Sequence, residues 1–90
     1  MGIEESWTSG GTGDAEIRER IRGLLDDLRV VRNRGMKVWA GRSPGGRPCA
    51  ACGRDLNLGE IEYEIVIGSV VTILLHRHCF AIWRSVNGQL

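Results

Sequence analysis

The chain is short of the residues on which several classes of protein depend. Its 90 residues include only three cysteines, two prolines, one tyrosine and one phenylalanine. Three cysteines cannot all pair as disulfides, which argues against a disulfide-stabilised secreted domain. No apolar stretch approaches the ~18 residues that a membrane-spanning helix requires, and residues 1–14 have neither the basic start nor the apolar run of an export signal. We therefore expect one small domain in the reducing cytoplasm, with no membrane partner.

A large charge of either sign is also lacking. The formal net charge is only +1, so net charge alone gives no reason to expect nucleic acid. The charges are nevertheless segregated. Residues 29–54 contain seven basic residues and no acidic one, whereas residues 55–64 contain four acidic residues and no basic one.

The three cysteines all belong to one pattern, Cys49-x2-Cys52 followed by His76-x2-Cys79. Two close pairs of thiolate and imidazole ligands match the tetrahedral shell of zinc, and four protein ligands leave no position for a water. The pattern predicts one structural, non-catalytic Zn²⁺; the alternative is two unrelated turns and an odd thiol. Adjacent ligands at His78 and Cys79 would bind one ion poorly, so we expect His76 to be the ligand.

Composition divides the chain into four segments. We expect a disordered Gly-rich tail over residues 1–13, an amphipathic helix over 14–34, a basic Gly/Pro linker over 35–47 and a zinc domain over 48–90.

The expected helix has Asp14 as its N-cap and Gly35 as its stop. Its apolar residues recur at helical spacing and form one stripe. They are Ile17, Ile21, Leu24, Leu25, Leu28 and Val31. The stripe must be buried, either on the zinc domain or against another helix in a dimer. The stripe from Ile17 to Val31 is therefore the expected surface for a protein partner or for self-association.

The expected hairpin begins with the alternating strand 60–67 and returns over 70–75. Gly68-Ser69 suits a two-residue turn that pairs Ile67 with Val70. This register places His76 on the face of Tyr63 and Ile65, and leaves apolar residues of the return strand among the glutamates.

A short helix is expected over residues 78–86, with Cys79 in its first turn. Its predicted buried face comprises Cys79, Ile82, Trp83 and Val86. A knuckle, a hairpin and a helix that supplies the last ligand follow each other in the order of a treble-clef zinc finger. We therefore predict an α+β fold, a small treble-clef zinc domain preceded by the amphipathic helix.

The segment Cys49-Ala-Ala-Cys52, the hairpin and His76-Arg-His-Cys79-Phe80 with Trp83 resemble the Cys-Cys-His-Cys fingers of poly(ADP-ribose) polymerases. The resemblance covers Cys49 to about Trp83 and implies the same four zinc ligands. In that family the finger grips DNA breaks. The inter-pair segment is shorter here and its first strand carries three glutamates, which repel phosphate, so the DNA-gripping residues do not carry over.

A wider run is similar to a group of small, uncharacterised bacterial zinc proteins, a resemblance that implies no function. It comprises Lys37-Val-Trp39-Ala-Gly41, Gly46-Arg-Pro48-Cys49-Ala-Ala-Cys52-Gly53, Glu60, Tyr63, His76, Cys79 and Trp83.

Two functional hypotheses follow, and neither is enzymatic, because no catalytic set or small-molecule site can be assembled from these residues. The favoured one is a protein-interaction or regulatory adaptor module. The alternative is a nucleic-acid-binding zinc finger that uses the basic segment 29–54, with Trp39 stacking on a base rather than pinning the linker. The expected contact residues are Arg18, Arg22, Arg29, Arg32, Arg34, Lys37, Trp39, Arg42 and Arg47. The arginines have a simpler interpretation as a solvated face.

Overall fold

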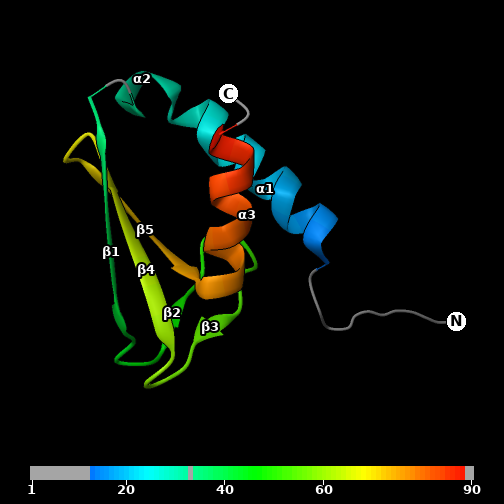
Figure 1. Cartoon of the computed structure of the whole chain (residues 1–90), viewed down its shortest axis with the longest axis vertical. Helices are drawn as coiled ribbons and strands as arrows, with labels where there is room; N and C mark the ends of the chain where they lie inside the picture. The colour runs from blue at the N-terminus through cyan, green and yellow to red at the C-terminus, as the bar shows by residue number, and fades with distance from the viewer. Residues whose placement is uncertain (1–12, 33, 89–90) are drawn as a thin grey trace, which may run out of the picture.

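The computed structural model describes residues 13–32 and 34–88, which form an α+β fold (Figure 1). Strands β1, β4 and β5 form one antiparallel sheet in the order β1-β4-β5, and β2 and β3 form a second, two-stranded sheet. The elements are α1 (Asp14–Asp27), α2 (Arg29–Arg32), β1 (Met36–Arg42), β2 (Arg47–Pro48), β3 (Asp55–Leu56), β4 (Ile61–Ile67), β5 (Val71–His76) and α3 (Arg77–Gly88). No helix of this described part of the chain is long and apolar enough to cross a membrane.

The core lies between the larger sheet and the two longer helices. Helix α3 packs over β4 and β5, and α1 packs on α3, so that both helices lie on one side of the sheet (Figure 1). The predicted buried face of α3, Cys79 to Val86, is buried as expected. Residues of α1, β4, β5 and α3 form a single apolar cluster that also contains the three cysteines. The three cysteines of the predicted metal site are therefore part of the core.

The predicted register of the hairpin is wrong by one residue. Ile67 pairs with Val71 instead of Val70, and His76 lies opposite Glu62. The turn is longer than expected because Gly68, Ser69 and Val70 all lie outside the strands, and Ser69 takes a positive φ of 63°. A one-residue slip moves every side chain of a strand to the other face.

In the observed register, a single layer of helices is enough to cover the buried apolar residues of the hairpin. Ile65 and Ile67 of β4 share a face with Ile73 and Leu75 of β5, and all are buried on the helical side. The glutamates share the opposite face with Thr72 and Leu74, so the buried apolar residues of the return strand do not lie among them.

The linker predicted over residues 35–47 is also wrong, because most of it is the strand β1. Met36–Arg42 pairs along its whole length with β4, from Met36 opposite Ile67 to Arg42 opposite Ile61. The glycines and prolines of this segment are typical of a linker. The signal that could have revealed the strand is the apolar and aromatic run around Val38 and Trp39, which is typical of strands.

The helix predicted over residues 14–34 is divided. Helix α1 ends at Asp27, and α2 begins after the turn residue Leu28. The N-cap is Gly13 instead of Asp14, and the backbone N–H of Gly13 donates to the Glu16 carboxylate. Gly35 takes the expected left-handed conformation, with φ 102°. The tail predicted over residues 1–13 lies outside the described residues except for Gly13.

Candidate metal centre

Three separate parts of the fold bring the four predicted ligands together. Cys49 and Cys52 flank the turn between β2 and β3, His76 ends β5, and Cys79 lies in the first turn of α3. One sulfur or ring-nitrogen atom of each residue lies within 4.8 Å of the others. Ligand atoms ~2.0–2.3 Å from one Zn²⁺ lie somewhat less than 4 Å apart, so this group is close to a tetrahedral shell. These four residues can hold one metal ion.

The knuckle between β2 and β3 orients its two cysteines through backbone hydrogen bonds. The N–H of Gly53 donates to the carbonyl of Cys49 at 2.9 Å, and the N–H of Cys49 donates to the carbonyl of Arg54 at 2.9 Å. Gly53 has a φ of 79°, which glycine adopts without strain. These two hydrogen bonds close the turn, and both of its cysteines are buried.

The orientation of His76 is fixed by the atoms on either side of its ring. Nε2 lies 3.1 Å from the carbonyl oxygen of Asp55, while Nδ1 lies 3.3 Å from the sulfur of Cys52. A carbonyl can only accept, so Nε2 carries the proton and the lone pair of Nδ1 faces the cysteines. A metal-binding histidine is commonly held by such a bond from its other nitrogen.

The sulfur atoms are close enough to change one another's acidity. A hydrogen bond from Cys79, assisted by backbone N–H groups, lowers the pKa of Cys49 to about 3 despite its burial. The same bond, burial and the charges of Cys49 and Cys52 raise the pKa of Cys79. The site therefore favours the thiolate of Cys49 and resists that of Cys79, and a divalent cation removes the repulsion between them.

The neighbouring histidine, His78, has a different environment. Its Nε2 lies 2.7 Å from a carboxylate oxygen of Asp14 in α1, and both side chains are exposed. His76 is instead only 9% exposed. The structure thus places His76, and not His78, among the cysteines.

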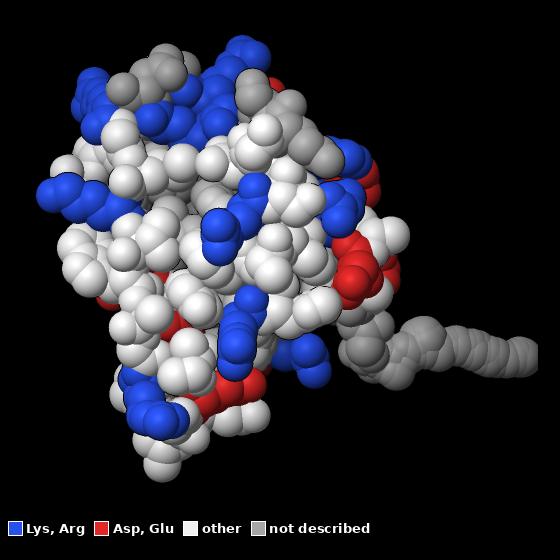
Figure 2. Space-filling view, in the orientation of Figure 1, with Lys and Arg blue, Asp and Glu red and all other residues white. Residues whose placement is uncertain are grey.

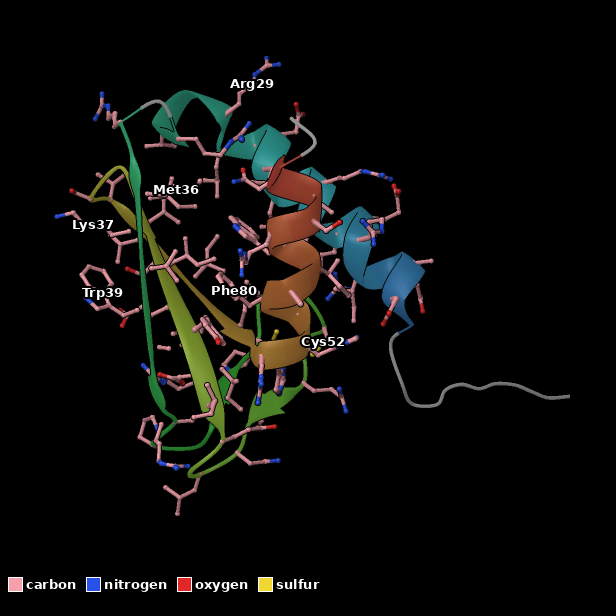
Figure 3. All side chains as sticks on the ribbon, in the orientation of Figure 1. Arg29, Met36, Lys37, Trp39, Cys52 and Phe80 are labelled. Atoms are coloured by element: carbon pink, nitrogen blue, oxygen red, sulfur yellow. The ribbon has the colours of Figure 1, made fainter. Side chains whose placement is uncertain are left out.

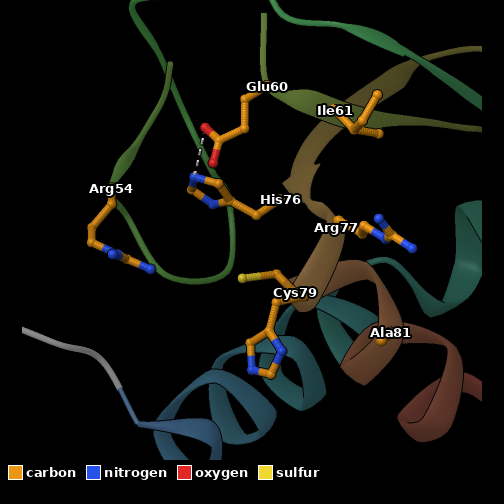
Figure 4. Close-up of a pocket in the computed structure, with 8 residues that line it drawn as sticks. Arg54, Glu60, Ile61, His76, Arg77, Cys79 and Ala81 are labelled. Atoms are coloured by element: carbon orange, nitrogen blue, oxygen red, sulfur yellow. Dashed lines mark ion pairs between the residues drawn. The ribbon is translucent and has the colours of Figure 1, made fainter.

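An open cleft of about 650 Å³ lies beside the ligand pair His76 and Cys79 (Figure 4). Glu60 stands on its rim, with a carboxylate oxygen 3.7 Å from Nε2 of His76. Arg54 and Arg77 line other parts of the cleft. The cleft gives solvent a route to the edge of the ligand group.

The nine residues predicted as nucleic-acid or partner contacts do not gather at one place. Arg18 and Arg22 belong to α1, whereas Lys37, Trp39 and Arg42 belong to β1, the edge strand of the sheet that α1 and α3 do not cover (Figure 1). Figure 2 shows lysine and arginine side chains gathered at the end of the molecule where α2 lies, and single ones spread over the rest of this face.

Several of these basic residues have partners within the chain. Arg22 pairs with Glu19 at 2.7 Å, and Arg29 pairs with Asp26 at 3.7 Å, both on exposed helix surface. The remaining partners are Asn87 for Arg32, the Gly59 carbonyl for Arg42 and Glu62 for Arg47. The exposed ion pairs of Arg22 on α1 and Arg29 on α2 agree with the simpler interpretation of a solvated helix face.

The apolar stripe of the helix is covered by the rest of the chain. Ile17, Ile21 and Leu25 are buried in the core, and α1 packs against α3. Of the two coverings considered for the stripe, the structure shows the intramolecular one. The stripe is therefore not an open surface of this structure.

Comparison of the chain with models of protein families, with curated proteins and with solved structures gives no significant match. The resemblance to poly(ADP-ribose) polymerase fingers and to small bacterial proteins therefore rests on the sequence motifs alone.

Proposed function

We propose that this protein is a small zinc-stabilised module that binds other protein chains through the edge strand β1. The order of knuckle, hairpin and ligand-bearing helix supports a zinc unit of the treble-clef type. Cys49, Cys52, His76 and Cys79 would supply all four ligands, and the ion would hold the fold together without taking part in a reaction.

Native mass spectrometry and a cysteine variant test the zinc part of the proposal. We expect one zinc per chain in the wild type and none in Cys52→Ser. Zinc-stabilised domains couple binding to folding, so the variant should also lose its cooperative unfolding transition. A folded wild-type chain with the mass of the apo protein would overturn the proposal.

One observation carries the interaction part, the exposure of β1. Every residue of this strand except Met36 is exposed, although the strand is fully paired with β4 on its other side. Val38 is 47% exposed and Trp39 is 52% exposed. Figure 3 shows the side chain of Trp39 projecting from β1 away from the helices. An exposed seven-residue edge strand that presents Val38 and Trp39 is a template for pairing with another chain.

Trp39 is also the observation that favours nucleic acid as the second candidate function, since an exposed indole next to Lys37 suits base stacking. Glu64 lies directly opposite Trp39 on β4, where its charge opposes a phosphate. We therefore rank this function second.

Gel-shift assays with single-stranded, nicked and duplex nucleic acid at two salt concentrations test nucleic-acid binding, because binding driven by phosphate contacts weakens steeply with salt. A salt-sensitive shift that Trp39→Ser abolishes would reverse the ranking.

A further inference from the structure

We propose that the partner of β1 is β1 of a second copy of this chain, paired antiparallel about a two-fold axis at Trp39. The inference rests on the proposed function and adds the identity of the bound chain. It would join two three-stranded sheets into one continuous sheet.

The hydrogen bonds on either side of β1 show which of its backbone groups point outward. Gly68 donates to the carbonyl of Gly35 at 2.8 Å, and Ser43 donates to the carbonyl of Glu60 at 2.7 Å. Both pairs continue the register of β1 with β4. Since hydrogen-bonded pairs alternate in an antiparallel ladder, the odd-numbered residues from 35 to 43 bond to β4. The N–H and C=O groups of Met36, Val38, Ala40 and Arg42 therefore face away from the sheet.

The other edge of the same sheet is already engaged. The N–H of Ala50, in the zinc knuckle, donates to the carbonyl of Leu74 in β5 at 2.9 Å. In the described part of the chain no strand pairs with the outer side of β1. Among the described strands, β1 is thus the open edge of the sheet.

A two-fold axis at Trp39 uses all of these outward groups. Met36 would pair with Arg42 of the second copy and Val38 with Ala40, so each outward residue meets another outward residue. Trp39 would lie opposite its own equivalent in a non-hydrogen-bonded pair, where side chains approach most closely and aromatic pairs are stabilising. Val38 would meet the small Ala40 on the helical side of the sheet.

The charges of the strand also suit pairing with itself. In this register Lys37 lies opposite Gly41, so no two cations face each other. Gly41 is unusual inside a strand, and a Cβ added there would meet no atom within 4 Å in its own chain. Beyond Gly41, on β4, lies the carboxylate of Glu62, whose Oε2 pairs with Arg47 and whose Oε1 accepts no hydrogen bond from the described residues. The missing side chain at Gly41 leaves Lys37 of the second copy an approach toward this second oxygen.

The test is sedimentation of the zinc-loaded chain from about 1 μM to about 1 mM, a range that covers the weak affinity of a one-strand interface. We expect the mass to double within it. Hydrogen exchange should show the amides of Val38 and Ala40 becoming protected as concentration rises. The amides of Lys37 and Trp39 should be protected throughout, because they bond to β4.

Ala40→Pro removes one outward N–H and leaves the hydrogen bonds between β1 and β4 in place. Trp39→Ser removes the aromatic pair. Each variant should weaken the dimer at least about tenfold. Leu58→Ser is the matched control, since Leu58 is 81% exposed but lies off the edge, and its dimer should persist. A folded, zinc-loaded monomer at the highest concentration, or a dimer whose Val38 and Ala40 amides stay unprotected, would overturn the second-copy proposal alone. A folded chain without zinc would instead overturn the proposed function.

Discussion

At the scale of single residues, the environment of a side chain separates residues that look alike in the sequence. His76 and His78 are two positions apart, yet one bonds to a backbone carbonyl beside the cysteines and the other to an exposed carboxylate. The same holds for the arginines. Arg47 pairs with Glu62, which is only 8% exposed, whereas Arg22 pairs with the exposed Glu19.

The two histidines provide a matched pair of variants. We expect His76→Ala to lower the affinity for zinc at least about 100-fold, because a ligand and its oriented lone pair are lost. We expect His78→Ala to bind zinc like the wild type. Competition with a chromogenic chelator measures both affinities. A similar loss in the two variants would contradict the assignment of His76.

The two arginine pairs differ in their expected contribution to stability. Arg47→Ala leaves the nearly buried carboxylate of Glu62 without its cation and should cost about 1–3 kcal/mol of unfolding free energy. Arg22→Ala breaks an exposed pair and should cost less than about 0.5 kcal/mol. Urea unfolding of the zinc-loaded variants measures both. Equal costs would show that Glu62 is better solvated than the structure indicates.

At the scale of the elements, the turns decide which faces of the strands meet. The β4–β5 turn contains two consecutive positive φ values, at Gly68 and Ser69, and it sets the register that buries the apolar residues of both strands. Gly68 also lies against α2. A Cβ at this position would come within 2.9 Å of the carbonyl oxygen of Val31.

Two glycines test this role of the turn. Gly68→Ala should destabilise the protein by about 1–3 kcal/mol, because the new methyl group strains a positive φ and meets a backbone atom. Gly23→Ala, in the exposed part of α1 with no atom within 4 Å, should instead stabilise it by about 0.5–1 kcal/mol. Thermal unfolding followed by circular dichroism distinguishes the two signs. A stabilising Gly68→Ala would contradict the close approach of the turn to α2.

At the scale of the whole molecule, the cysteines of the candidate metal site and the apolar core are one unit. The cluster that contains Cys49, Cys52 and Cys79 also contains Ile21 of α1 and Leu75 of β5. Loss of the ion would therefore act on α1 as well as on the residues near the site. The cleft beside His76 gives a chelator access to the ligand group.

Metal removal tests this coupling. Excess chelator should abolish the cooperative unfolding transition and the amide protection of α1 together, and zinc should restore both. At free zinc 100-fold above its dissociation constant, binding stabilises the folded state by about 2.7 kcal/mol. Circular dichroism and hydrogen exchange provide the two readouts. Protection of α1 that survives in the apo chain would show that the helices fold independently of the metal.

The sequence by itself determined the ligand group and the local elements with strong periodic signals. The ligands could be predicted because zinc coordination restricts residue type and spacing together, and Cys49 to Cys79 satisfy both restrictions at once. The buried face of α3 and the left-handed Gly35 could be predicted because helical periodicity and glycine conformation are properties of short segments.

Only the tertiary structure decided the register of the hairpin, the covering of the helix stripe and the nature of β1. Each depends on contacts between segments distant in sequence. One added turn residue reverses the faces of a strand, the helix stripe fits either α3 or a second chain, and β1 is a strand because β4 offers it a ladder. The exposed edge around Trp39 arises in the same way, because a strand has an open side only once its partner on the other side is in place.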